Sequence, residues 1–219
     1  MKSVMPLSYI FIILFSLNGF AQKNLLFIGD SFTAGDGVEE NKIFPSLVGQ
    51  ELTGINAINQ GRSGWPTSAY LRRWDEVAES LPESAEVVFV QLGANDLRVD
   101  GHSQETIEQC AQNMEVIVGR IQTLLPKAKI VLMSSVKIEE AQLTDKIREA
   151  GFGKHSNRYL RHIGKSYKKL AKAKDFDYID LIAKLPKHNT HDGAHLNEAA
   201  HEIVAAVILR YLENAGFSQ

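Results

Sequence analysis

Three residues of this 219-residue chain have the types that nucleophilic acyl transfer needs. Ser31 ends a Gly-Asp-Ser turn after an apolar run, and Asp192 and His195 lie near the C-terminus in Asp-Gly-Ala-His. A serine hydroxyl needs an adjacent base, and that base needs an acceptor on its other ring nitrogen. A spacing of three brings Asp192 and His195 together on one turn. The pattern predicts Ser31 as nucleophile, His195 as base and Asp192 as the carboxylate that orients it.

Two further segments offer hydrogen-bond donors for the oxyanion that forms during acyl transfer. Gly61, within Asn59-Gln-Gly-Arg-Ser-Gly64, allows close approach of the backbone to a ligand. Asn95, within Gly93-Ala-Asn-Asp96, could aim its side-chain amide at the oxyanion. If a helix follows Ser31, the N–H of Ser31 lies near its positive end. We therefore expect Ser31, Gly61 and Asn95 to form an oxyanion hole.

Asp30, Trp65 and Arg98 flank these positions and are candidate substrate contacts. Trp65 could stack against a sugar face, or it could be a packing aromatic. Arg98 could contact an anionic group, or it could be a solvated surface arginine. Asp30 could serve only as the capping residue of the turn before Ser31.

A metal site is the local alternative at the C-terminal motif. His188, His191 and His195 cluster around Asp192, and histidine and carboxylate ligands suit zinc. The spacing of these residues matches no zinc signature, and the sequence offers no evident second ligand group. The serine mechanism requires no metal and no organic cofactor, so we expect none.

The surrounding pattern alternates short apolar runs with longer amphipathic stretches. Strands are predicted at residues 24–28, 55–58, 86–92, 129–134 and 176–179, and helices at residues 43–52, 68–80, 104–125, 157–173 and 197–214. Strands separated by helices pair in parallel, and continuously apolar strands are covered on both faces. We predict a three-layer α/β/α domain whose ligand site lies beyond the carboxyl ends of the strands. The irregular segment 136–156 is either a helical insert or a mobile flap beside that site.

Composition excludes some classes of protein. The formal net charge is −2, and the absence of a long basic run argues against a nucleic-acid partner, whose binding depends on neutralised phosphates. Cys110 is the single cysteine, so no intrachain disulfide can form. Cys110 falls in a predicted amphipathic helix, where we expect it to be a small buried apolar side chain.

The first 21 residues have the pattern of a signal peptide. Lys2 is followed by an apolar stretch over residues 7–17 and by Gly19-Phe-Ala21 with small residues two apart. The stretch is shorter than the about 20 residues of a bilayer span. We expect cleavage after Ala21, no stable membrane span afterwards and a domain over residues 22–219; the alternative is an uncleaved anchor. Export without disulfides fits a bacterial periplasm or secretion.

Taken together, the four segments resemble the SGNH hydrolases, also called the GDSL family of esterases and lipases. Gly29-Asp-Ser-Phe32 matches the first block with Phe32 in place of leucine, Gly61 the second, Asn95 the third and Asp192-Gly-Ala-His195 the last. The resemblance implies the roles assigned above and a flavodoxin-like sheet of order 2-1-3-4-5. The segment Gly29–Gly35 is similar to the arylesterase and thioesterase/lysophospholipase branch.

We therefore expect an exported serine esterase that acts on a small-molecule or glycan ester, with acetyl on a carbohydrate as the favoured substrate. A lysophospholipase or thioesterase is the enzymatic alternative. An inactive module that binds a glycan or a partner protein is the non-enzymatic one. The oligomeric state is not determined by the sequence.

Overall fold

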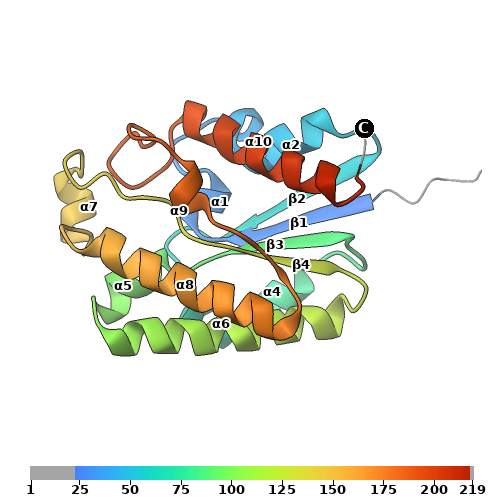
Figure 1. Ribbon diagram of the computed structural model, residues 1–219, viewed down its shortest axis with the longest axis horizontal. Helices are drawn as coiled ribbons and strands as arrows, with labels where there is room; N and C mark the ends of the chain where they lie inside the picture. The colour runs from blue at the N-terminus through green and yellow to red at the C-terminus, as the bar shows by residue number, and fades with distance from the viewer. Residues whose placement is uncertain (1–22, 218–219) are drawn as a thin grey trace, which may run out of the picture.

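The computed structural model describes residues 23–217, which fold into three layers around one sheet (Figure 1). The strands are β1 (Lys23–Gly29), β2 (Ile55–Gly61), β3 (Val87–Gln91), β4 (Lys129–Met133) and β5 (Asp177–Ile179). All pair in parallel, in the order β2-β1-β3-β4-β5. The predicted three-layer α/β/α fold and its strand order are confirmed. The predicted signal peptide lies outside the described residues.

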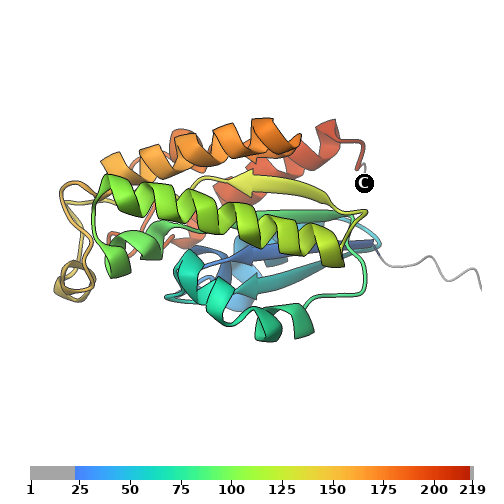
Figure 2. The same ribbon diagram turned by 90° about the horizontal axis from the view of Figure 1, so that it is seen from below.

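Helices cover both faces of the sheet. One face carries α2 (Phe44–Glu51) and α10 (Glu198–Asn214), and the other carries α3 (Thr67–Arg72), α4 (Trp74–Glu79), α5 (Ala94–Asp100), α6 (Gln104–Leu124) and α8 (Ser156–Lys174) (Figures 1 and 2). The short elements α1 (Ser31–Ala34), η1 (Glu40–Lys42), α7 (Asp145–Glu149) and α9 (Leu181–Lys184) lie in connections. None of the helices within residues 23–217 combines the length and apolar character needed to cross a bilayer.

The core forms where apolar strands meet the apolar faces of the helices. Every residue of β3 is buried, and the rings of Phe27 and Phe89 stack with centroids 5.0 Å apart. On α6 the predicted apolar face is buried from Ile107 to Ile121, whereas Leu124, at the end of the helix, is 45% exposed. Cys110 is fully buried within that face, as predicted.

Two departures from the predicted elements concern helix continuity. The single helix predicted over residues 68–80 is two helices, because Arg73 leaves helical geometry at φ −110° and ψ 33°. The apolar spacing continues across this break, so periodicity does not reveal it. The irregular segment 136–156 contains α7, which confirms a helical insert.

The register of the sheet decides where the polar motifs emerge. Gly29 at the end of β1 is paired with Gly61 on one side and Gln91 on the other. The three strands therefore end at the same level, and the loops that follow them leave from one edge. This edge lies beside α7 and the N-terminal end of α8 (Figure 1).

Candidate active site

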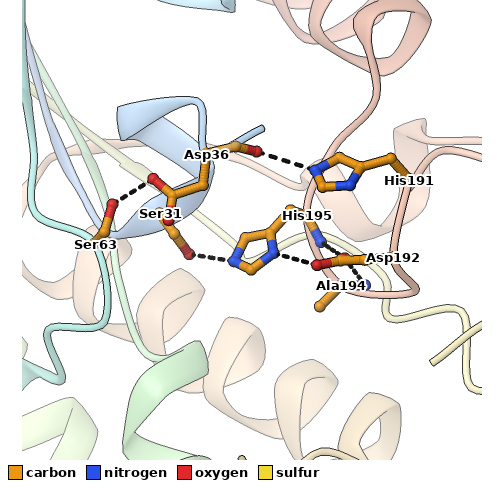
Figure 3. A network of polar contacts seen from close by, with 7 residues as sticks. All are labelled: Ser31, Asp36, Ser63, His191, Asp192, Ala194 and His195. Atoms are coloured by element: carbon orange, nitrogen blue, oxygen red, sulfur yellow. Dashed lines mark hydrogen bonds and ion pairs between the residues drawn. The ribbon is translucent and has the colours of Figure 1, made fainter. Parts of the chain in front are cut away.

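A chain of hydrogen bonds joins the three residues predicted to act in acyl transfer (Figure 3). The Nε2 atom of His195 lies 3.1 Å from Ser31 Oγ, and its Nδ1 atom lies 2.7 Å from Asp192 Oδ2. Ser31 is 7% exposed and lines a cavity together with His195. The structure thus brings residues 164 positions apart into contact, as the sequence predicted.

Asp192 is held by the turn that also carries His195. Its Oδ1 atom accepts hydrogen bonds from the backbone N–H groups of Ala194 and His195, at 2.9 and 2.8 Å. Burial alone would raise the pKa of Asp192, but these bonds and the His195 side chain outweigh it and lower that pKa. The lowered pKa favours the ionised carboxylate, whose Oδ2 atom faces Nδ1 of His195.

The ring of His195 is flanked by two other rings. It is stacked with the ring of His191 at a centroid distance of 5.9 Å, and it lies 6.2 Å from the ring of Phe32. His191 Nε2 contacts the Asp36 carbonyl oxygen at 3.1 Å, and the Asp36 carboxylate accepts a hydrogen bond from Ser63 (Figure 3). Asp36 therefore connects the loops after β1 and β2 to the histidine loop, a role that no sequence signal indicated.

Ser31 is positioned by the tight passage from β1 into α1. A Cβ atom at Gly29 would lie 2.0 Å from Thr33 Oγ1, so only glycine permits this passage. Asp30 is fully buried and caps α1, with Oδ1 accepting from the N–H of Phe32 at 3.1 Å. The expectation that Asp30 contacts substrate is wrong, because the side chain points into the protein.

Asp30 has an unusual electrostatic environment. Burial, reinforced by the nearby carboxylates of Asp96 and Asp36, raises its pKa to about 7. Its Oδ2 atom has no hydrogen-bond partner within the described residues. A buried carboxyl without a partner for one oxygen carries a penalty when ionised, so the protonated form is favoured below neutral pH.

Asn95 and Gly64 line the same cavity as His195, and both are bound by Arg98. Arg98 Nε donates to Asn95 Oδ1 at 3.1 Å, and Arg98 Nη2 donates to the Gly64 carbonyl oxygen at 2.7 Å. A guanidinium can only donate, so the contact fixes the oxygen of the Asn95 amide and directs Nδ2 elsewhere. Arg98 lines the cavity beside Ser31, and its predicted contact with an anionic group of the substrate stays a prediction. In the structure its Nε and Nη2 atoms are hydrogen-bonded to Asn95 and Gly64.

The structure corrects the predicted role of Gly61. Its N–H donates to Asn59 Oδ1 at 2.9 Å, and a Cβ atom there would lie 2.2 Å from the Ala34 nitrogen. Gly61 is therefore a packing position between β2 and α1. Gly64, three residues later, lines the cavity with a φ of +76°. Both glycines belong to one motif, and only the path of the loop distinguishes them.

Trp65 also differs from its predicted role. Its ring packs edge-on against Tyr70, with centroids 5.2 Å apart, and the guanidinium of Arg73 lies 4.2 Å from the ring centroid. Trp65 is absent from the lining of the cavity beside Ser31. The structure therefore gives it the packing role, and the expected sugar platform is wrong.

A cavity of about 260 Å³ opens beside Ser31. Its lining combines the polar site with an apolar wall: Ser31, Phe32, Asp36, Gly64, Ala94, Asn95, Arg98, Lys146, Ile147, Ala150, Phe152, Ala194 and His195. The residues from 146 to 152 belong to the helical insert. Sequence reasoning placed this segment beside the site but did not identify which of its residues line the cavity.

The insert is hydrogen-bonded to the histidine loop. Glu139 N donates to the Gly193 carbonyl at 2.8 Å, and Thr144 N donates to the Asp192 carbonyl at 3.1 Å. The Glu139 carboxylate accepts from Thr190 Oγ1 at 3.2 Å. Gly193 has a φ of +94°, and a Cβ atom there would lie 2.5 Å from the Leu143 backbone. The insert therefore supports the loop that carries Asp192 and His195.

The residues of the alternative metal site are only partly assembled. Ligand atoms of His191, Asp192 and His195 lie within 4.8 Å of one another, whereas His188 is outside this group and contacts Gln142 through Nδ1 at 2.8 Å. Both ring nitrogens of His195 are already engaged by Ser31 and Asp192. A metal ion on His195 would have to displace one of these contacts, and with it the geometry for proton transfer.

Comparison with known proteins adds a family match over the whole site. The model of the GDSL-like lipase/acylhydrolase family matches residues 27–203. A curated Mycoplasma pneumoniae relative, described as an uncharacterized protein, is 31% identical over 117 residues, which cover 51% of this chain and 13% of that protein. The chain thus spans only a small part of the length of that relative.

Solved structures show the same fold at low sequence identity. Est24, described as a carbohydrate acetylesterase from Sinorhizobium meliloti, has a TM-score of 0.73 at 19% identity, covering 88% of this chain and 99% of its own. The M. smegmatis aryl esterase has a TM-score of 0.73 at 18% identity with the same coverage. Axe2, described as an acetylxylan esterase from Geobacillus stearothermophilus, has a TM-score of 0.63 at 23% identity, covering 86% and 93%.

Proposed function

The chain belongs to the GDSL-like lipase/acylhydrolase family, and from this premise we propose that it hydrolyses carboxylic esters through Ser31, His195 and Asp192. The observation that carries the proposal is the continuous hydrogen-bond chain from Asp192 through His195 to Ser31. In the first step His195 Nε2 removes the Ser31 proton as Oγ attacks the ester carbonyl. Asp192 holds the ring and stabilises its charge, and His195 then protonates the departing alcohol.

Three donors would hold the tetrahedral oxyanion. They are the N–H of Ser31 at the start of α1, the N–H of Gly64 and the Nδ2 of Asn95, whose amide is oriented by Arg98. Preorganised donors stabilise the charge that develops in the transition state. Water then attacks the acyl-enzyme with His195 again as base, which releases the acid and restores Ser31.

The substrate we propose is a short acyl ester, with acetyl on a carbohydrate favoured. The small cavity beside Ser31, closed on one side by Ile147, Ala150 and Phe152, supports a short acyl group. Two proteins of the same fold, the carbohydrate acetylesterase Est24 and the acetylxylan esterase Axe2, support the choice of an acetylated sugar. A lysophospholipase or thioesterase is the enzymatic alternative, and an inactive module that binds a glycan or a partner protein is the non-enzymatic one.

Hydrolysis of p-nitrophenyl esters from acetate to octanoate tests this proposal. The protein starting at Gln22 is compared with Ser31→Ala and with Ser46→Ala, a control serine on α2. We expect activity to be highest on acetate, to be lost in Ser31→Ala and to persist in Ser46→Ala, with unchanged melting temperatures. Highest activity on octanoate would favour a lipid or thioester substrate, and near-normal turnover by Ser31→Ala would refute the mechanism.

We also propose that the chain is exported to a bacterial periplasm or secreted after cleavage behind Ala21. The pattern of residues 1–21 supports this. Mass spectrometry of the protein expressed from the full reading frame gives the mature N-terminus. A mass that begins at Gln22 agrees with the proposal, and an intact Met1 in the membrane fraction contradicts it.

A further inference from the structure

Helix α8 carries an unusual concentration of positive charge. Its residues 156–174 include seven of the 24 lysine and arginine side chains of the chain and none of the 26 acidic ones. The chain as a whole has a net charge of −2, so the remainder is clearly negative. Such an asymmetry marks a surface that attracts an anionic partner.

The cations fall on one face of the helix. Arg158, Arg161, Lys165, Lys168 and Lys172, here called the α8 stripe, follow one another in steps of three and four residues and are all exposed. Leu160, Ile163, Tyr167 and Ala171 bury the opposite face. Within residues 23–217 no member of the stripe forms an ion pair; on α8 only Lys174 does, with Glu115 at 2.6 Å. Their charges are therefore available to a ligand.

Two hollows lie along the stripe and share Arg161. One, of about 330 Å³, lies between α8 and the end of the sheet and is lined by Ser134, Gly164, Lys165, Lys168 and Tyr178 among others. The other, of about 490 Å³, reaches Lys137, Lys154, Arg158, Lys187 and His188, with Glu139 and Glu140 also on its wall. The two hollows, together called the groove, reach Lys187 and His188, which precede Asp192 and His195 in the chain. The groove shares no lining residue with the cavity beside Ser31. The N-terminal end of α8 lies beside the edge of the sheet at which β1, β2 and β3 end (Figure 1).

The spacing of the charges distinguishes between polyanions. At a rise of about 1.5 Å per residue, steps of three and four place one cation roughly every 5 Å along the helix. Duplex DNA carries one negative charge per about 1.7 Å of helix axis, or about 3.4 Å along each strand, which is denser. In a polysaccharide with one carboxylate or sulfate on each sugar, neighbouring negative charges are separated by the length of one sugar. This distance is close to the separation of neighbouring cations in the α8 stripe.

A membrane surface fits these observations less well. Interfacial helices insert apolar side chains between lipid head groups, but the apolar face of α8 is already packed in the core. The large exposed apolar side chains of the described residues are Val99, Val116 and Leu124, and none belongs to α8.

We propose that the α8 stripe and its groove bind an acidic polysaccharide and lead its ester-bearing residue toward Ser31. The choice of a glycan rests on the proposed esterase function, whereas the binding itself needs no catalysis. The acidic polymer lies along Arg158 to Lys172, and Gly164 and Tyr178 accommodate its sugar rings. Exposed charges are screened by salt beyond about 10 Å at 0.1 M, so the affinity falls as ionic strength rises.

Binding of labelled polygalacturonate oligomers to the Ser31→Ala protein tests the inference, with neutral xylo-oligosaccharides, duplex DNA and anionic lipid vesicles as comparison ligands. The test variant is Lys165→Glu/Lys168→Glu. The control is Lys127→Glu/Arg210→Glu, which makes the same charge change at exposed positions off α8. We expect at least tenfold weaker binding of polygalacturonate by the test variant, less than twofold by the control, and loss of binding at high salt.

The inference is overturned if the unaltered stripe does not bind polygalacturonate at low salt, if both variants lose binding equally, or if DNA or vesicles bind more tightly. In the Ser31-containing protein, both variants should hydrolyse p-nitrophenyl acetate at the normal rate. Absence of that activity alone would refute the proposed esterase function. Loss of polysaccharide binding alone would refute only the inference about α8.

Discussion

Arg98 provides the sharpest test of how the oxyanion site is built. Its guanidinium donates to Asn95 Oδ1 at 3.1 Å and to the Gly64 carbonyl at 2.7 Å, so one side chain positions two of the three proposed donors. Arg98→Ala removes both contacts and frees the Asn95 amide to rotate. Because Arg98 acts through these donors, we expect a loss in kcat with little change in KM.

The size of that loss follows from the cost of ordering the donors. Immobilising a side chain costs about 0.5–1.5 kcal/mol and fixing the backbone of one residue about 1–2 kcal/mol, so leaving the Asn95 amide and the Gly64 N–H to be ordered during catalysis costs roughly 2 kcal/mol. At about 1.4 kcal/mol per tenfold this is roughly a 30-fold lower kcat. Complete loss of a donor, as in Asn95→Ala, sets the upper limit of the loss in kcat at about 10² to 10³-fold.

A double-mutant cycle on p-nitrophenyl acetate separates positioning from other roles. In the Asn95→Ala background Arg98→Ala should lower kcat only about fivefold, since about 1 kcal/mol of its effect acts by ordering the backbone of Gly64. Arg98→Lys should also be impaired, because one ammonium cannot reproduce the two contacts of a guanidinium fork. Equal effects of Arg98→Ala in both backgrounds, or normal activity of Arg98→Lys, would refute the positioning role.

Three further predictions concern stability. His201 is buried, and its Nδ1 atom accepts a hydrogen bond from Phe44 N at 3.1 Å. Burial lowers the pKa of His201 to about 4. Its contribution to the free energy of unfolding is therefore full above the unfolded pKa of 6.5 and decreases by about 3 kcal/mol as pH falls toward 4. Chemical denaturation should show a smaller decrease over this range in His201→Asn, and an unchanged pH profile would contradict it. Asp30, with its raised pKa of about 7, has the opposite sign: stability is lost as pH rises from about 4 to 7. The free energy of unfolding of Asp30→Asn, measured relative to the unaltered protein, should therefore be higher at pH 8 than at pH 4. A variant that gains no relative stability at pH 8 would disprove the ionisation penalty. Gly193→Ala should lower the melting temperature and the esterase activity together, because left-handed backbone costs about 1–2 kcal/mol for alanine and its Cβ would overlap Leu143; a variant with normal values of both would show that the turn is not constrained.

The fold and the central residues could be predicted because their signals are local. Apolar runs such as Leu25–Ile28 and Val87–Val90 require burial on both faces, and the helices between them require parallel pairing. Ser31 and the Asp192–His195 pair each sit in a short motif whose own geometry positions the side chains. Convergence at one edge of a parallel sheet then follows from topology alone.

The tertiary structure decided which atoms are free to act. Gly61 and Gly64 are equivalent as residue types, but Asn59 occupies the N–H of Gly61 while the loop brings Gly64 to the cavity. Arg98 contacts Asn95 and Gly64, and Trp65 is covered by Arg73. The contact between Arg98 and Gly64 joins residues 34 positions apart and leaves no local pattern. The contacts of Asn59 with Gly61 and of Arg98 with Asn95 are local, but residue types alone do not show which donor they occupy. The sequence by itself determined the elements and the chemical groups, whereas packing determined their partners.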